Sequence, residues 1–411
     1  MLDINFIREN VDLVKKGIGN KGFEPSLIDK VLELDEKRRS LLLEIEQLRA
    51  KRNRIAKEKK PSEEAKKLKE DLKDKEPELE KVQAEYKETL FKIPNLPSEK
   101  APVGGSEKEN VEIRKWGNPT KFAFEAKDHL EIGKKLGILD FETGAKVTGS
   151  QFFFLYGDGV LLELALTNFV LDKLAKKGYL PVMTPDLAKS RYYLGTGYSP
   201  KGQEAQTYTI DGTDLGLIAT AEVTLAGAHA DEIIPEGKLP LKYVGYSHCF
   251  RQEAGAYGKY SKGLYRVHQF TKTEMFIYCK PEDSEKFHEE ILNMEEEIFQ
   301  DLEIPYRVVE MCTGDLGAMA SRKFDIEAWM PGRKDYGEVT STSNVTDYQA
   351  RNLNIKFRRD IGETEYVHML NGTAIVMSRV PLAILENFQQ EDGSVKIPEV
   401  LQKWMGKEKI E

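Results

Sequence analysis

The sequence predicts an α+β domain preceded by a long antiparallel α-helical arm. Apolar residues at heptad spacing run through residues 27–86, and a segment rich in proline and glycine follows at 93–106. Beyond it, strands rich in Tyr, Val and Phe mix with helices such as 284–302, without the regular alternation of a parallel sheet. We therefore expect two domains, residues 1–105 with an arm at about 27–91, and residues 106–411.

The arm is predicted from two apolar seams. The first alternates steps of four and three residues through Leu27, Val31, Leu34, Arg38, Leu41, Ile45, Leu48, Arg52 and Ile55. The second follows a turn near Pro61 and Ser62 and consists of Leu68, Leu72, Lys75, Leu79, Val82 and Tyr86. At ~1.5 Å per residue, residues 27–60 span on the order of 50 Å, which is longer than a core helix requires. Pro77 is expected to kink the second helix.

The tip of this arm is basic, although the whole chain is acidic with a formal net charge of -8. Between residues 49 and 60, Glu58 alone opposes Arg49, Lys51, Arg52, Arg54, Lys57, Lys59 and Lys60. A polyanion responds to the local field, so such an arm can bind nucleic acid. A solvated coiled coil with a lysine-rich face is the alternative.

Composition indicates a highly charged protein outside the membrane. The 411 residues are 40% hydrophobic and 32% charged, enough for more than one domain. No stretch approaches the ~18 apolar residues of a membrane span, and Met1–Asn10 lacks the apolar core of a signal peptide. We expect a cytoplasmic protein. Cys249, Cys279 and Cys312 are odd in number and lack zinc-ligand spacing with histidine, so we interpret them as packing residues.

A charged hairpin is the first candidate for chemistry. Residues 241–250 and 264–278 alternate as strands, and the glycine-rich segment 255–263 between them cannot continue either one. Arg251 and Glu253, two apart on a strand, should share a face, where a guanidinium grips phosphate and a carboxylate accepts amine protons. That pairing suits ATP, with Lys259 and Lys262 in a lid over polyphosphate or RNA. A salt-bridged surface hairpin is the alternative.

A second cluster lies near the C-terminus. Small and apolar residues from Asn371 to Ser378 run into Arg379, and the segment continues through Val380 to Asn387 as a strand turning into a helix. Small residues let a ligand approach closely, and an isolated arginine after an apolar run needs an anionic partner. That partner is either a ligand or a nearby carboxylate. No GxxxxGK[ST] motif is present, so ATP would be held by side chains on strands.

Together the two clusters resemble motifs 2 and 3 of class II aminoacyl-tRNA synthetases. Residues 178–185 after the amphipathic segment 161–177 resemble motif 1, and Thr220-Ala221-Glu222 resembles the TxE element of the seryl-tRNA synthetases. Further segments similar to the bacterial-type seryl family are 1–10, 311–316, 338–344 and 347–351. These matches span almost the whole chain in order.

The resemblance implies a mainly antiparallel sheet flanked by helices and a homodimer formed through motif 1. It implies activation of L-serine with ATP to seryl-adenylate and pyrophosphate, then transfer of serine to tRNA(Ser), and to tRNA(Sec) where that tRNA exists. The arm would grip the long variable arm and elbow of the tRNA across the dimer. Residues implied for this contact are Arg49, Arg52, Arg54 and Lys57.

The resemblance also assigns site residues. Arg251, Glu338 and Arg379 are the implied catalytic residues, and Glu338 and Ser341 the implied Mg²⁺ ligands. ATP would contact Arg251, Gln252, Glu253, Val267, Phe270, Glu338, Val339, Thr340, Ser341 and Arg379. Serine would contact Thr220, Ala221, Glu222, Arg251, Glu274, Asn371 and Thr373. Glu222 and Glu274 could divide the ammonium and hydroxyl contacts in more than one way.

Two departures from the family pattern concern the nucleotide site. Ser378 stands where a glycine often precedes the motif 3 arginine, and Lys259, Tyr260 and Lys262 replace an Arg-Asp-Thr-Arg run. Lysine cannot reproduce bidentate contacts. Two other functions are alternatives. A synthetase-like ligase acting on a carrier protein does not need the basic arm, and a nonenzymatic RNA-binding or coiled-coil protein does not need the charged clusters together.

Overall fold

The computed structural model describes residues 1–57, 63–198, 206–253 and 262–411. They form two compact units, Met1–Pro97 and Ser98–Glu411, with the division inside the segment rich in helix breakers. Among the described residues, no helix is long and apolar enough to cross a membrane. The predicted turn at Pro61 and Ser62, with Glu58, Lys59 and Lys60, lies outside the described residues, as do Lys259 and Tyr260.

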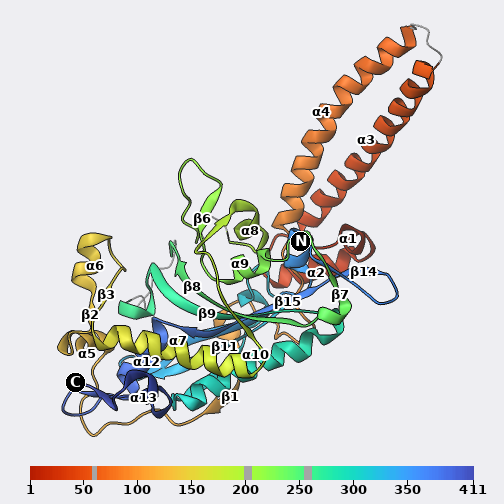
Figure 1. Ribbon diagram of the computed structural model, residues 1–411. Coiled ribbons are helices and arrows are strands. Elements are labelled where there is room, and N and C mark those ends of the chain that lie inside the picture. Colours follow the sequence, from red (N-terminus) through yellow and green to blue (C-terminus); the bar gives the residue numbers. More distant parts are fainter. Residues whose placement is uncertain (58–62, 199–205, 254–261) are drawn as a thin grey trace. The chain divides into compact units, whose positions relative to one another are not determined.

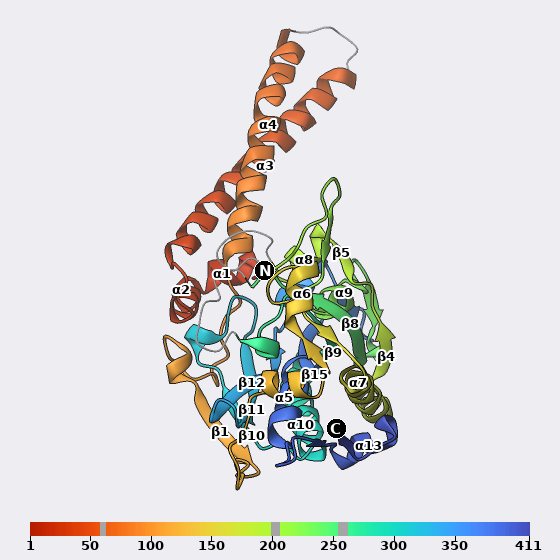
Figure 2. The same cartoon turned by 90° about the vertical axis from the view of Figure 1, so that its left-hand side faces the viewer.

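The first unit is helical, as the heptad spacing predicts. Its helices are α1 (Ile4–Glu9), α2 (Val11–Asn20), α3 (Ser26–Lys57) and α4 (Glu63–Lys92). Helices α3 and α4 run side by side in opposite directions (Figures 1 and 2). The seam is buried at Leu34, Leu41 and Val82, which pack together, whereas Leu48 and Ile55 toward the tip are only half-buried. Helix α4 continues through Pro77.

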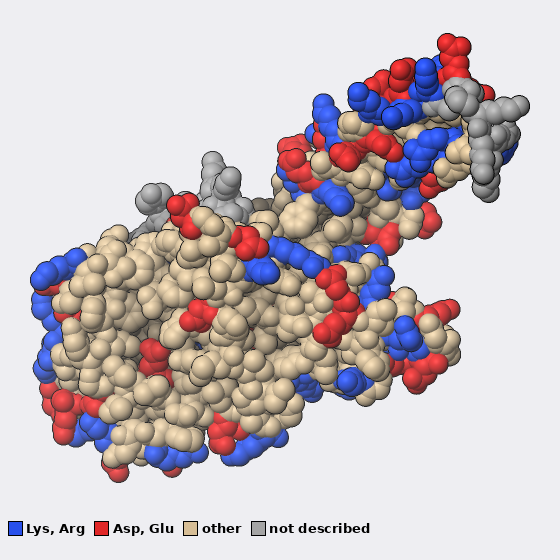
Figure 3. Space-filling view, turned by 45° about the horizontal axis from the view of Figure 1, so that its top comes forward, with Lys and Arg blue, Asp and Glu red and all other residues tan. Residues whose placement is uncertain are grey.

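Charged residues of α3 are partly matched by α4. Arg49 Nη2 lies 2.7 Å from Glu76 Oε1, and the Lys75 ammonium is paired with Glu44. Arg38, which interrupts the seam, bonds Asp35 at 2.8 Å and lies over the Tyr86 ring at 4.8 Å. Figure 3 shows acidic and basic side chains interspersed along the visible face of the two helices. The basic tip predicted from α3 alone therefore has acidic neighbours contributed by α4.

The second unit is built on a sheet that is antiparallel except at one edge. Within the described residues, eight strands follow the order β1-β10-β11-β12-β15-β9-β8-β4. Their bounds are β1 (Val111–Trp116), β10 (Tyr306–Glu310), β11 (Arg322–Met330), β12 (Asp335–Asn344), β15 (His368–Val376), β9 (Gln269–Cys279), β8 (Leu241–Phe250) and β4 (Leu180–Met183). Only β4 pairs with its neighbour β8 in parallel. The predicted α+β class is confirmed.

Helices cover both faces of this sheet (Figure 1). The helices are α5 (His129–Lys135), α6 (Phe141–Val147), α7 (Asp158–Lys176), α8 (Ser190–Gly195), α9 (Glu222–Gly227), α10 (Ser284–Asp301), α11 (Tyr348–Leu353), α12 (Arg379–Asn387) and α13 (Glu399–Met405). Short strands are β2 (Leu139–Asp140), β3 (Phe154–Leu155), β5 (Leu187–Lys189), β6 (Leu215–Leu217), β7 (Ile233–Pro235), β13 (Lys356–Arg358), β14 (Thr364–Tyr366), β16 (Val395–Lys396) and β17 (Lys409–Ile410).

The pleat of β9 shows how the sheet divides its side chains. Met275 and Ile277 join the core cluster that contains residues of α7 and α10. Phe276 and Tyr278 face the other way and pack with residues of α9 and α11. Because alternate residues of a strand point to opposite faces, Phe270, Lys272 and Glu274 lie on the α9 face. That face carries the cavity described below.

The hairpin prediction is correct for its first strand and wrong for its ends. β8 has the predicted bounds, but β9 begins at Gln269 because Gly263–Tyr265 forms a 3₁₀ turn. Arg251 lies one residue beyond β8, and Glu253 has a left-handed backbone with φ of 49°. These two residues are therefore not on a regular strand. Cys249, Cys279 and Cys312 are free and buried, as predicted for packing residues.

Candidate active site

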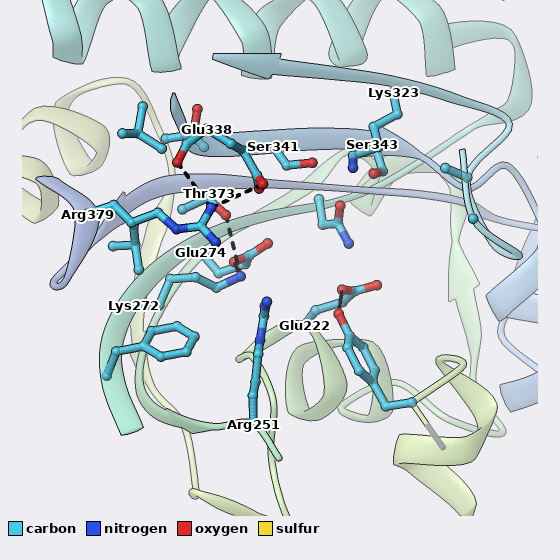
Figure 4. A pocket seen from close by; sticks show the side chains of 18 of the residues that line it. Glu222, Arg251, Lys272, Glu274, Lys323, Glu338, Ser341, Ser343, Thr373 and Arg379 are labelled. Atoms are coloured by element: carbon cyan, nitrogen blue, oxygen red, sulfur yellow. Dashed lines mark hydrogen bonds and ion pairs between the residues drawn. The ribbon is translucent and has the colours of Figure 1, made fainter. Parts of the chain in front are cut away.

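A cavity of about 300 Å³ opens on the α9 face of the sheet. Figure 4 shows Glu222, Arg251, Glu274, Glu338 and Arg379 converging on it from separate elements. Of the residues predicted from the sequence, the cavity is lined by Glu222, Arg251, Glu253, Val267, Phe270, Glu274, Glu338, Val339, Thr340, Ser341, Asn371, Thr373 and Arg379. Residues of both charged clusters, which lie far apart in the chain, thus line one cavity.

Of the residues predicted to contact serine or ATP, three lie outside the lining. Thr220 is fully buried, and its hydroxyl donates to Glu274 Oε2 at 3.3 Å. Ala221 packs in the core beside Leu225. The Gln252 amide donates to the Thr207 carbonyl at 2.8 Å, so it fixes the backbone after β8. These residues support the cavity from behind.

The carboxylates that line the cavity differ in their partners. Among the described residues, Glu253 pairs with Arg266 at 2.9 Å, Glu338 with Arg379 at 3.1 Å, and Glu274 with the Lys272 ammonium. Glu222 instead accepts bonds from two neutral groups, the Tyr198 hydroxyl at 2.8 Å and the Gln349 amide at 2.7 Å. Burial and the nearby Glu274 carboxylate raise the pKa of Glu222. Glu222 is therefore the described cavity carboxylate without an ion-pair partner.

Arg379 is held at the start of α12 by several contacts. Its Nη1 donates to the Glu338 carbonyl at 3.1 Å, and its Nε donates to the Tyr265 carbonyl at 3.1 Å. The guanidinium also lies over the Tyr265 ring at 4.6 Å. Burial opposes the charge on Glu338, but Arg379 and Lys323 outweigh it and lower the pKa of Glu338 to about 2. Glu338 is thus ionised at neutral pH.

Arg251 approaches the cavity from the end of β8. Its Nε donates to the Ala219 carbonyl at 3.3 Å, and its guanidinium lies 5.3 Å from the Phe270 ring centre. Arginine favours such an aromatic face because of the ring quadrupole. These contacts use one N–H and one face of the guanidinium, which leaves further N–H groups to donate to an anion in the cavity.

A buried glutamate supports one of the residues that line the cavity. Thr340 Oγ1 donates to Glu295 Oε2 of α10 at 3.0 Å, and Glu295 is fully buried. Burial raises the pKa of Glu295 well above its ordinary value. On the neighbouring strand β11, burial raises the pKa of Asp325 to about 7, although the Lys323 ammonium 3.5 Å away lowers it.

Glu338 and Ser341, the predicted metal ligands, both line the cavity. Carboxylate and hydroxyl oxygens suit Mg²⁺, which usually takes one or two protein ligands and completes its shell with phosphate and water. Among the described residues, no cluster of three or more His, Cys, Asp and Glu could hold a metal ion by itself. The donor set therefore fits a cation shared with a phosphate ligand rather than a closed protein site.

Several lining residues were missed in the sequence. They are Tyr198, Tyr265, Arg266, Lys272, Met319, Lys323 and Ser343. Lys272 could have been found, because it is two residues from both Phe270 and Glu274 and must share their face. Tyr198 and Met319 lie on loops that carry no periodic signal, so sequence spacing could not place them.

Comparison with known proteins decides the family. Residues 1–97 match the seryl-tRNA synthetase N-terminal domain, and residues 207–388 match the tRNA synthetase class II core domain (G, H, P, S and T). A serine–tRNA ligase of Dictyoglomus thermophilum is 57% identical over 99% of this chain and 98% of its own. The chain belongs to the seryl-tRNA synthetase family.

Solved structures of seryl-tRNA synthetases agree with this assignment. The enzyme of Pyrococcus horikoshii, complexed with ATP, superimposes with a TM-score of 0.92 at 44% identity, covering 100% of this chain and 99% of that one. The cytoplasmic serine–tRNA ligase of Naegleria fowleri, in complex with AMP, gives 0.89 at 38% identity, covering 100% and 99%. The predicted family and class II fold are confirmed. The N-terminal match favours a synthetase over the carrier-protein ligase considered from the sequence.

Proposed function

We propose that this chain activates L-serine with ATP and transfers the seryl group to tRNA(Ser). The serine carboxylate attacks the α-phosphorus of ATP, which forms seryl-adenylate and releases pyrophosphate; the terminal adenosine hydroxyl of the tRNA then takes the seryl group. The observation that carries the proposal is the cavity itself, where Arg251, Glu338 and Arg379 meet Glu222 and Glu274 in a chain of this family. Such a reaction depends mainly on positioning and charge neutralisation.

The two arginines divide the nucleotide between them. Arg251 neutralises the α-phosphate and the serine carboxylate, because its guanidinium can donate to both in one plane. Arg379 contacts the γ-phosphate, and its bonds to Glu338 and Tyr265 hold it in place before ATP arrives. Glu253 contacts the adenine amine, and Phe270 stacks on the base with Arg379 on the opposite side. Val267, Val339 and Thr340 complete the wall of this subsite, and Gln252 supports it through its bond to the Thr207 carbonyl.

Mg²⁺ would be held by Glu338 and Ser341, whose oxygens line the same wall. When bound, the ion neutralises phosphate charge and favours in-line attack. Glu338 is prepared for this role because it is ionised at neutral pH, with a pKa of about 2. The exposed fraction of its side chain is 42%, so the carboxylate is accessible from the cavity.

The serine subsite contains two glutamates, and only one of them is paired with a cation among the described residues. Glu222 has no cation partner among the described residues, so it takes the substrate ammonium. Glu274 is already neutralised by Lys272, so it reads the hydroxyl together with Thr373. Thr220 and Asn371 support these contacts, and Ala221 keeps the wall close. Alanine would leave buried polar groups unpaired, and threonine would need room for one more methyl group.

Residues 1–105 bind tRNA, and residues 106–411 carry out the chemistry. The tRNA contacts lie on α3 at Arg49, Arg52, Arg54 and Lys57, and the exposed Arg52 and Arg54 can donate directly to phosphate. The same contacts serve tRNA(Sec) where it exists. We place the reaction in the cytoplasm as part of this proposal.

The working form is a homodimer with tRNA bound across the two subunits. Leu161 and Leu164 of α7, with Leu180 and Met183 of β4, leave apolar side chains exposed next to the sheet edge, up to 80% at Met183. Exposed apolar surface of this kind marks an interface. Two copies meeting along α7 and β4 would cover it.

The decisive experiment is amino-acid-dependent exchange of labelled pyrophosphate into ATP, run with each of the twenty amino acids. We expect exchange with serine alone. Arg251→Ala should abolish exchange while tRNA binding is kept, because Arg251 belongs to the other unit from the arm. Arg307→Ala is the matched control, since Arg307 pairs with Glu327 away from the cavity. The proposal would be contradicted if exchange persisted in Arg251→Ala, or if none of the twenty amino acids supported exchange in the parent chain.

A further inference from the structure

A histidine and a glutamate that do not line the cavity are buried together and bonded to several elements around it. His129, the first residue of α5, has its Nδ1 2.9 Å from Glu386 Oε1 of α12, and the two side chains are 8% and 2% exposed. The same carboxylate oxygen accepts the His129 backbone N–H at 3.1 Å. The other oxygen, Oε2, accepts the Gly332 N–H at 2.8 Å. Glu386 thereby joins α12, the start of α5 and the turn between β11 and β12.

The second ring nitrogen of His129 reaches the segment that leads into β9. His129 Nε2 lies 3.2 Å from the backbone nitrogen of Leu264, which is a donor. Nε2 must therefore accept, and Nδ1 must carry the proton that is donated to Glu386. A neutral imidazole in this single tautomer satisfies both neighbours. The fit is close, since a Cβ on Gly263, where φ is 64°, would stand 2.2 Å from Nε2.

The residue after Leu264 connects this pair to the nucleotide subsite. The Tyr265 carbonyl accepts the Arg379 Nε proton at 3.1 Å, and the Tyr265 ring lies under the Arg379 guanidinium at 4.6 Å. Arg333, one residue after the Gly332 held by Glu386, lies over the same ring at 4.6 Å. Two routes from the His129 and Glu386 pair thus converge on Tyr265.

We infer that His129 is a positioning residue for ATP, and that it acts through Leu264 and Tyr265 on the Arg379 guanidinium. The His129 and Glu386 pair holds Leu264, just before β9, against α12, which begins with Arg379. The Tyr265 carbonyl and the Arg379 guanidinium therefore keep one relative position. Supporting groups of this kind matter because a displacement of about 1 Å at a positioned group can cost on the order of 100-fold in rate. The inference rests on the proposed function, which assigns ATP to Arg379.

The test compares His129→Ala, His129→Gln and the parent chain in serine-dependent pyrophosphate exchange. We expect His129→Ala to raise KM for ATP about tenfold, with KM for serine within about twofold, because Arg379 and the serine subsite are served by different elements. A glutamine amide supplies one donor and one acceptor, so His129→Gln should recover KM for ATP to within about threefold. His229→Gln is the matched control, since His229 bonds Glu232 and Tyr243 away from the cavity.

Coupling to Arg379 separates positioning from general destabilisation. In the Arg379→Ala background, adding His129→Ala should leave KM for ATP unchanged, because the group it positions is gone. Independent, multiplying effects would overturn the inference, as would equal losses in both KM values. If His129→Ala does not fold, Gly263→Ala displaces the ring instead and should give the same selective rise. If Arg379→Ala itself leaves KM for ATP unaltered, the proposed function fails; if only the His129 variants are silent, this inference alone fails.

Discussion

Replacing Lys272 by methionine tests the buried charge balance of the serine subsite. The Lys272 and Glu274 side chains are 7% and 3% exposed, so the pair is screened little by water. Breaking a buried pair by removing one partner typically costs about 3–5 kcal/mol, because the other charge stays buried. Lys272 also lies 3.4 Å from Thr373 Oγ1, so the substitution removes a weak hydrogen bond as well. We expect Lys272→Met to lower the free energy of unfolding of this unit by roughly 3–5 kcal/mol.

The double variant Lys272→Met, Glu274→Gln provides the second half of the cycle. It removes both charges, and the amide oxygen of the new glutamine can still accept the hydrogen bond from Thr220 Oγ1. Its loss of stability should therefore be only about 1 kcal/mol. The two substitutions should therefore be strongly non-additive. Lys100→Met is the matched control, since Lys100 pairs with Glu285 at an exposed site and should cost less than about 1 kcal/mol.

Urea unfolding followed by tryptophan fluorescence measures these changes in the correct unit. Trp116, Trp329 and Trp404 all lie within Ser98–Glu411, so the signal reports the unit that contains Lys272. A loss in Lys272→Met no greater than that in Lys100→Met would refute the reasoning. Additive single and double variants would do the same. Either result would mean that Glu274 is neutralised by a group other than Lys272.

Three further predictions follow from separate features. Burial raises the pKa of Glu295 in the native state, so its contribution to stability falls as pH rises above about 4.5, where the unfolded chain releases the proton. Glu295→Gln should therefore gain stability relative to the parent as pH rises above that value, and a difference that stays constant with pH in urea titrations would exclude this. Replacing residues 41–82 by a short linker, close to where Leu41 and Val82 pack, should leave pyrophosphate exchange intact and remove tRNA aminoacylation; loss of exchange would contradict the division of labour. Leu164→Asp should yield a monomer by sedimentation equilibrium, and an unchanged dimer would exclude the α7 surface as the interface.

The sequence predicted the elements whose apolar pattern is regular. The helices α3 and α4, strand β8 and helix α10 lie within a few residues of their predicted bounds, because heptads and alternation report directly on which face is buried. The start of β9 was misplaced by five residues. Gly263–Tyr265 forms a 3₁₀ turn there, held by His129, which lies 135 residues away in the chain.

Local spacing could not recover contacts made by distant segments. Arg251 and Glu253 both line the cavity, as their spacing predicted. They do so without a regular strand, because Glu253 has a left-handed backbone. Glu222 is hydrogen-bonded by neutral groups instead of a cation, namely Tyr198 from a loop and Gln349 from α11. The sequence left open how Glu222 and Glu274 divide the serine contacts, and the division proposed above rests on these two bonds. The pairing of Arg49 with Glu76 likewise required the register of α3 against α4.

The three thiols of this chain are all enclosed by protein. Cys249, Cys279 and Cys312 have no exposed surface, and burial raises the pKa of Cys249 and Cys279. Maleimides react with an accessible thiolate, so the native chain should resist labelling while it stays folded. If a cysteine were introduced on the exposed side of α3, for example at Leu43, a maleimide fluorophore would react at that position and not at the natural cysteines. The chain can therefore report movements of its helical arm during a catalytic cycle without removal of any natural cysteine.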